Sequence, residues 1–235
     1  MTTPALLAVS HGTADVDGAA AVARLVARVA EELPGVAVHE AFVDVQQPEA
    51  ATALAAIDGP VVIVPLLLSS GFHVNVDIGG LARDDLAIAP PLGPDPRLAD
   101  VLAERLAQAG GALGTASGAS GSPDTPVILA VAGSRDPASE TDALAMAGLL
   151  AARLGRPVET AYLAAREPRL DTVAAQHPDA VVAAYLLAHG YFHDLAVRQA
   201  GASVVTEPLL DAAEPPAALV DLVLSRYRDA AASLG

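Results

Sequence analysis

The feature that most constrains the fold of this chain is an internal repeat. Residues 6–13 (LLAVSHGT) align with residues 127–134 (VILAVAGS), and residues 66–73 (LLLSSGFH) align with residues 186–193 (LLAHGYFH). Around these matches, short apolar runs of strand length alternate with segments whose apolar residues recur at helical spacing. Strands and helices that alternate with short connections indicate parallel sheets covered by helices on both faces. We therefore predict an α/β fold made of two similar copies.

A Gly/Ala/Ser-rich segment at residues 110–125 separates the copies and is typical of a flexible linker. We predict an N-terminal domain at residues 1–109 and a C-terminal domain at residues 126–235, related by internal duplication. Each is expected to hold a small four-stranded parallel sheet in the order 2-1-3-4, and the first helix is expected from about Ala19. The expected strands are residues 6–10, 36–43, 61–68, 86–89, 127–131, 158–163, 180–187 and 203–206.

The composition excludes several kinds of chemistry and of partner. The chain has no cysteine and its 13 basic residues are all arginine, which excludes disulfides, thiolate ligands, iron–sulfur clusters and a reactive lysine. A formal charge of −15 disfavours nucleic acid and anionic membranes as partners. Because we find no long apolar run and no signal peptide, we expect a cytoplasmic protein with no membrane span.

Two histidines follow neighbouring strands of the first predicted sheet. His11 comes directly after the first strand and His73 lies in the loop after the third. Ligands of open parallel sheets bind beyond the carboxyl ends of the strands, and adjacent strands lie about 4.8 Å apart. Two imidazoles suit Fe²⁺, Co²⁺, Ni²⁺ or Zn²⁺, and Asp44 at the end of the second strand could complete the ligand set. Such a site keeps open coordination positions, as a reactive site requires.

The second copy keeps only part of this arrangement. In the alignment, His193 corresponds to His73, whereas Ala132 replaces His11, so we predict a degenerate site in the C-terminal half. His189 and His193 are four residues apart, which on a helix would put them on one face and suggests a second metal site. We expect them instead to span a strand-to-helix loop, which favours a structural role.

The chain resembles the class II tetrapyrrole chelatases, and most closely the two-domain sirohydrochlorin chelatases of sirohaem and cobalamin synthesis. The resemblance depends on Ser-His-Gly-Thr after the first strand, on Ala-Phe-Val-Asp and Gln-Pro after the second, on the segment around His73, and on an opening of the second copy that lacks its histidine. The residues are 10–13, 41–44, 47–48, 65–78 and 132–137.

The resemblance implies insertion of Fe²⁺ or Co²⁺ into a metal-free tetrapyrrole without ATP, with the metal as substrate and no organic cofactor. His11 and His73 match the catalytic metal-binding histidines of the family, and Asp44 falls where many members carry glutamate. Metal insertion removes two pyrrole protons, and histidine can bind a metal or accept a proton near neutral pH. We predict that His11 and His73 present the ion and that one of them accepts a proton, with Asp44 or Asp77 as a relay.

Further residues are assigned to substrate binding. Sirohydrochlorin carries many carboxylates, so Arg135 and Arg83 are candidates to bind them, although solvated surface positions are the alternative. Ser10, Gly71 and Phe72 flank the two histidines and are also assigned to the substrate. A cleft between the two halves would accommodate the flat macrocycle.

Two other functions remain compatible with the sequence. The first is a non-catalytic carrier of a metal or tetrapyrrole, which would use the same cleft and histidines. The second is a hydrolase or isomerase, for which Ser10 or Ser69 near a histidine is the available nucleophile. The sequence separates neither iron from cobalt or nickel nor one macrocycle from another, and the duplication is compatible with a monomer.

Overall fold

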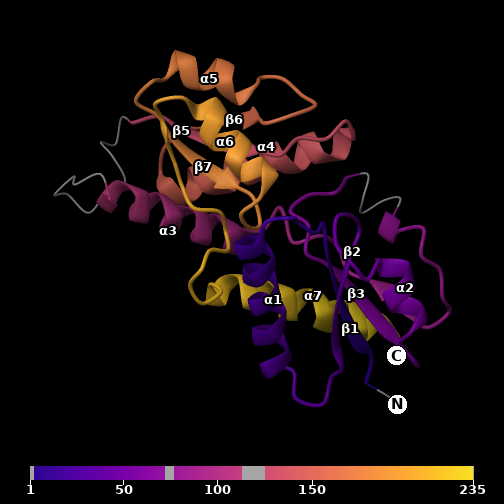
Figure 1. The fold of residues 1–235 in the computed structure, drawn as a ribbon. Helices are drawn as coiled ribbons and strands as arrows, with labels where there is room; N and C mark the ends of the chain where they lie inside the picture. Colours follow the sequence, from indigo (N-terminus) through magenta and orange to yellow (C-terminus); the bar gives the residue numbers. More distant parts are fainter. Residues whose placement is uncertain (1–2, 72–76, 113–124, 235) are drawn as a thin grey trace.

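The computed structural model describes residues 3–71, 77–112 and 125–234 and contains two parallel sheets of four strands each (Figure 1). The strand orders are β2-β1-β3-β4 and β6-β5-β7-β8, which confirms the predicted topology of both copies. The elements of the first half are β1 (Ala5–Ser10), α1 (Val16–Glu31), β2 (Val38–Phe42), α2 (Ala50–Ala55), β3 (Val61–Pro65), β4 (Leu86–Ile88) and α3 (Pro96–Ala112). Those of the second half are β5 (Val127–Val131), α4 (Pro137–Leu154), β6 (Val158–Tyr162), α5 (Leu170–Gln176), β7 (Val181–Tyr185), α6 (Tyr191–Ala200), β8 (Val204–Val205), α7 (Ala217–Ala231) and η2 (Ala232–Leu234).

Burial explains the continuous apolar runs of the central strands. Every residue of β1, β3, β5 and β7 is buried, because these strands lie inside their sheets and are covered on both faces. By contrast β2 and β6 are edge strands whose first residues are partly exposed. The central strands therefore hold the carboxyl-end loops on a rigid base.

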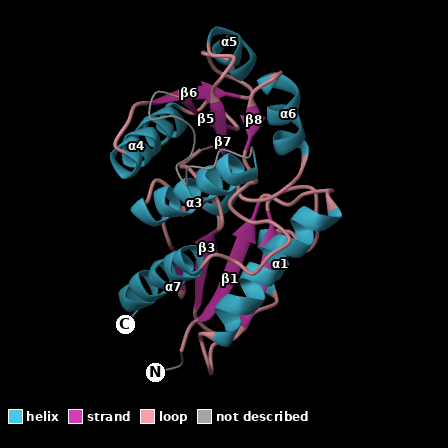
Figure 2. Cartoon of the chain, turned by 90° about the vertical axis from the view of Figure 1, so that its left-hand side faces the viewer, coloured by secondary structure: helices cyan, strands magenta, loops and turns pink. Residues whose placement is uncertain are grey.

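The last helix of each half packs against the other half. Helix α3 belongs to the first copy in sequence but contacts α4 and β7 of the second, and α7 belongs to the second copy but contacts β3, β4 and α1 of the first. Figures 1 and 2 show α3 beside the second sheet and α7 beside the first. Because α3 and α7 also contact each other, one apolar core runs through both halves.

Three local expectations were wrong. Helix α1 begins at Val16 rather than near Ala19, because the carboxylate of Asp15 accepts the Gly18 N–H at 2.7 Å and caps the helix. The predicted linker starts too early, since α3 continues to Ala112, while its residues 113–124 lie outside the described part. His193 is not in a loop but in the first turn of α6. Within the described ranges, no helix is long and apolar enough to cross a membrane.

Candidate active site

A cavity of about 660 Å³ lies where the carboxyl ends of both sheets face each other. This volume is typical of small-molecule sites, and the walls are mostly apolar. Segments from the strand ends of both halves form the walls, so neither half makes the site alone. They comprise residues 10–15, 22, 45–46, 66–69, 71, 131–134, 139 and 185–192.

His11 lies in this cavity at the end of β1. It is partly buried, and its Nδ1 is 3.3 Å from the carbonyl oxygen of Gly12. Gly12 has φ +88°, and a Cβ there would overlap the carbonyl oxygen of Asp44. Glycine therefore lets the chain turn sharply just after His11 and close against the end of β2. Ser10, which was assigned to the substrate, is buried and also lines the cavity, and its role remains a prediction.

The backbone of Asp44 lies next to His11, but its carboxylate is exposed. The Asp44 N–H donates to the His11 carbonyl at 3.1 Å, and Oδ1 accepts the N–H of Val45 at 2.8 Å. The cavity wall here is formed by the next two residues, of which Gln46 accepts the Thr13 N–H at 2.9 Å. Asp44 is thus at the rim beside His11, and its role as a ligand remains a prediction.

The other predicted ligand, His73, and its neighbour Phe72 lie outside the described residues. The described chain before them reaches the cavity, where Gly71 is buried and faces Ser134 of the other half. Asp77 is exposed. Among the residues that the structure describes, no group of three or more histidine and carboxylate side chains could hold a metal ion. The His11–His73 pair is therefore still a prediction from the sequence.

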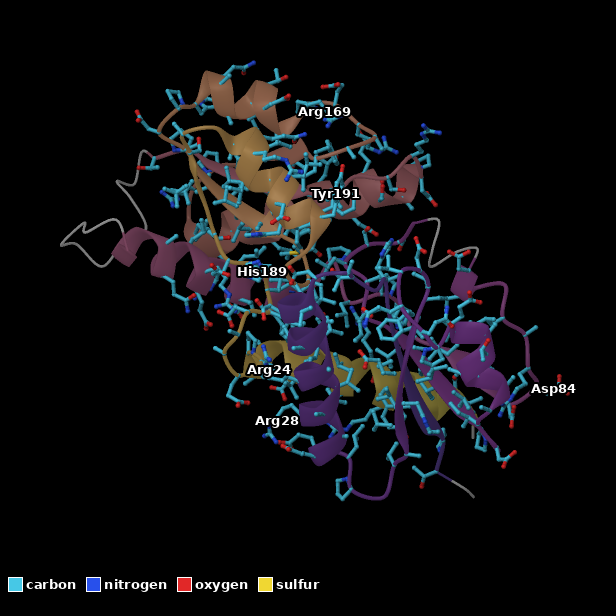
Figure 3. All side chains as sticks on the ribbon, in the orientation of Figure 1. Arg24, Arg28, Asp84, Arg169, His189 and Tyr191 are labelled. Atoms are coloured by element: carbon cyan, nitrogen blue, oxygen red, sulfur yellow. The ribbon has the colours of Figure 1, made fainter. Side chains whose placement is uncertain are left out.

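The two arginines assigned to the substrate lie elsewhere. Arg83 is far from the cavity: its guanidinium pairs with Asp85 at 2.6 Å and donates to carbonyl oxygens at the end of α2 and before β3. In Figure 3 its neighbour Asp84 is on the outer edge of the first half. The substrate role of Arg83 is therefore not supported. Arg135 is exposed and follows Ser134, which lines the cavity, so it is at the rim rather than in the wall.

The second half differs from the first in its histidines. Ala132 lines the cavity at the position that His11 has in the first half. His193 is buried, and its Nε2 donates to the carbonyl oxygen of Thr206 at 3.1 Å. The strand registers also correct the alignment, because Val9 pairs with Pro65 and the equivalent Ala130 pairs with Ala184.

The corrected register shifts the third strands by one residue relative to the sequence alignment. Carried forward from the strands, it matches Gly71 with Gly190 and Ser70 with His189. His73 lies outside the described residues, so its correspondence with His193 stays a prediction from the sequence.

Sequence reasoning missed Tyr185, whose side chain crosses between the halves. It is fully buried at the end of β7, and its hydroxyl donates to the Leu68 carbonyl at 2.8 Å. Burial raises the pKa of this phenol far above its usual value, and Asp142 and Asp95 raise it further. The sequence shows only a tyrosine in an apolar strand, and no pattern indicates where its hydroxyl points.

The fold and cavity define a class: a duplicated α/β protein with a small-molecule cavity between the carboxyl ends of two parallel sheets. The family model named CbiX matches the chain twice, over residues 5–109 and 126–227. The chain therefore belongs to the CbiX family, which confirms the resemblance to class II chelatases.

Individual relatives agree with this membership. The sirohydrochlorin cobaltochelatase of Methanosarcina acetivorans is 27% identical over 123 residues, which are 44% of this chain and 95% of that protein. SirB from Bacillus subtilis with Fe³⁺ has a TM-score of 0.79 and 20% identity, covering 98% of this chain and 96% of SirB. A CbiX described as the terminal enzyme of sirohaem biosynthesis in denitrifying bacteria has a TM-score of 0.67 and 22% identity, covering 94% of this chain and 98% of that one. At these identities the solved structures establish the fold.

Proposed function

We propose that this protein inserts a divalent metal, Fe²⁺ or Co²⁺, into sirohydrochlorin or a related tetrapyrrole without ATP. The observation that carries the proposal is the imidazole of His11 in the wall of an apolar cavity between the two halves, in a chain of the CbiX family. The names of the relatives support the substrate class, since one is a sirohydrochlorin cobaltochelatase and a SirB structure contains cobalt.

The cavity supplies what such a reaction requires. A macrocycle is flat and apolar over its faces, so walls formed by residues such as Val22, Leu66 and Leu187 can exclude water from them. We assign His11 and His73 to hold the incoming metal ion, with Asp44 at the rim. A neutral imidazole that releases the ion can accept a pyrrole proton, so that the ion enters as two protons leave.

The substrate's carboxylates extend from the edge of the macrocycle, so they would meet the rim. Arg135 is exposed there, and no hydrogen bond of its guanidinium to the described residues competes with a substrate carboxylate. We further propose that the protein works in the cytoplasm and that it is a monomer. The monomer is supported by two observations: a single chain supplies both walls of the cavity, and helices α3 and α7, each of which packs against the other half, hold the two halves together.

The test is an anaerobic absorbance assay in which sirohydrochlorin is mixed with Fe²⁺, Co²⁺ or Ni²⁺ and a catalytic amount of protein. We expect multiple turnovers with the wild type and a loss of at least about 100-fold for His11→Ala and for His73→Ala, as for removal of an acid–base group. His39→Ala is the matched control, because His39 is exposed on the edge strand β2 and outside the cavity.

Two outcomes would contradict the proposal. Near-normal insertion by both the His11→Ala and His73→Ala variants would remove the assigned metal site. A spectral change that stops at one equivalent of protein would instead identify a carrier, because a carrier binds stoichiometrically and does not turn over.

A further inference from the structure

The second half has a histidine–carboxylate pair whose histidine lines the cavity. His189 lines the cavity, and its Nε2 is 2.7 Å from Oε2 of Glu207, which follows β8 and is more than half exposed. The pair has no equivalent in the first half, where the strand registers put Ser70 and Pro90 at the two positions. The half that lacks the counterpart of His11 thus carries a different titratable group on the same cavity.

The geometry fixes how the His189 ring is used. An ionised carboxylate only accepts hydrogen bonds, so Nε2 carries the proton that is donated to Glu207. Nδ1 then keeps its lone pair, and it makes no hydrogen bond with the described residues. This is the orientation that a carboxylate gives to a histidine that accepts protons, because the carboxylate also stabilises the imidazolium that forms.

The neighbours of His189 hold it at the junction of the halves. Its carbonyl oxygen is 3.5 Å from the Thr13 hydroxyl, and it packs so closely on Gly18 of α1 that a Cβ there would overlap it. Figure 3 shows His189 at the end of the second half that meets the start of α1. The ring also packs edge-on against His193, with centroids 4.5 Å apart.

The arrangement favours a proton acceptor over a second metal site. The Nε2 of His193 donates to the Thr206 carbonyl and the Nε2 of His189 donates to Glu207, so neither of these two nitrogens is available to a metal ion. No metal-binding group of three is found among the described residues, which include all three of these.

We propose that His189, oriented by Glu207, accepts a pyrrole proton of the tetrapyrrole from the second-half side of the cavity; this inference rests on the proposed function. The N–H bond of one pyrrole breaks as its proton binds Nδ1, and the freed nitrogen electron pair forms a bond to the entering ion. The imidazolium passes its proton to solvent, which reaches Glu207. The second pyrrole proton leaves on the His11 side, so one divalent ion enters for two protons released.

The experiment compares His189→Ala and Glu207→Gln with wild type in the anaerobic assay with Co²⁺ and sirohydrochlorin. We expect kcat to fall about 100-fold for His189→Ala and about 10-fold for Glu207→Gln, while KM and the Kd for Co²⁺ stay within about twofold. Added imidazole should restore part of the turnover of His189→Ala, which a merely structural role would not allow. The acid limb of the kcat–pH profile should change in Glu207→Gln. Among the described residues, the other titratable groups near His189 are His193, which packs against its ring, and Asp15, whose carboxylate lies with the His189 carbonyl beside Gly18 of α1.

The matched control is His177→Ala, which removes a second histidine–carboxylate pair of the same half, His177 with Glu159 at 3.3 Å, away from the cavity. It should leave turnover unchanged. Wild-type kcat and an unaltered pH profile in both test variants would overturn the inference, as would loss of Co²⁺ binding in step with kcat, which would make His189 a ligand. Absence of turnover in the wild type would instead refute the proposed function, and the inference with it, before any variant is compared.

Discussion

The two halves build the same turn at the site but place different side chains before it. Gly12 and Gly133 have φ angles of +88° and +89°, and each packs against a carbonyl oxygen at the end of the neighbouring edge strand. The residue before the glycine is His11 in the first half and Ala132 in the second. The shared glycine is thus a requirement of the fold, whereas the residue before it is free to differ between the halves.

Helices α3 and α7, each of which packs against the other half, also have equivalent contacts in the two halves. Arg105 of α3 and Arg226 of α7 occupy equivalent positions, counted from the first residue of each helix. Arg105 donates to the Leu209 carbonyl at 3.0 Å, and Arg226 donates to the Pro91 carbonyl at 3.0 Å. Each arginine therefore fastens its helix to the loop after the last strand of the other half. These arginine contacts belong to the duplicated scaffold and are nearly the same in the two halves. The residue before the glycine turn, by contrast, is histidine in one half and alanine in the other.

The largest effect is expected when the difference between the halves is reversed. In the double variant His11→Ala/Ala132→His, the imidazole moves to the equivalent turn of the second half. We expect turnover to stay at least about 100-fold below wild type, because the variant lacks the His11 imidazole of the first half and no group of three possible metal ligands is found among the described residues of the second half. Metal titration should show no site in the second half. Activity close to wild type would mean that the two turns are interchangeable.

The two shared glycines, Gly12 and Gly133, should contribute equally to the stability of the fold. Gly133→Ala forces a side chain into a left-handed conformation and against the Ala164 carbonyl, so we expect unfolding free energy to fall by about 3 kcal/mol. Gly12→Ala should cost a similar amount. Gly148→Ala, in helix α4 with open space around it, should be neutral or stabilising by up to about 1 kcal/mol. Urea denaturation measures all three, and a tolerated Gly133→Ala would contradict a scaffold role.

The buried ion pair of α3 should contribute more to the free energy of unfolding than an exposed one. Arg105 is 2.6 Å from Asp211 and nearly inaccessible, so Arg105→Ala leaves a partly buried carboxylate without its partner and should cost about 2 kcal/mol. Arg153→Ala is the control, because its ion pair with Asp100 joins α4 to α3 at the same 2.6 Å but is about half exposed on both sides. Its removal should cost less than about 1 kcal/mol. Equal losses in urea denaturation would show that burial does not set the value of these contacts.

The sequence predicted the features that depend on local pattern. The strands, the duplication and the placement of His11 at a strand end follow from apolar runs and their spacing, whereas the strand order follows the flavodoxin-like order that is common in open parallel sheets. The exchange of α3 and α7 could not be predicted, because a helix with an apolar face fits either sheet and only the loop geometry selects one. The location of Arg83 was also beyond sequence, since the carbonyl groups that it binds come from residues 24 to 29 positions earlier in the chain.

The smallest effect concerns Tyr185, which joins the halves through a single hydrogen bond. Tyr185→Phe removes the donor to the Leu68 carbonyl, and we expect the free energy of unfolding to fall by about 1 kcal/mol at pH 7.

Burial raises the pKa of the Tyr185 phenol in the folded protein, whereas the unfolded chain ionises near pH 10. Below that pH both states keep the proton. Above it the unfolded state loses the proton first, so stability falls by about 1.4 kcal/mol per pH unit from this group. The Phe variant should therefore lose less stability than wild type between about pH 10 and 11, and the exposed Tyr191→Phe should behave like wild type. If the free energies of unfolding of wild type and Tyr185→Phe changed in parallel with pH, the Tyr185 hydroxyl would be accessible to solvent. The contact between the two halves at this point would then be looser than the buried tyrosine indicates.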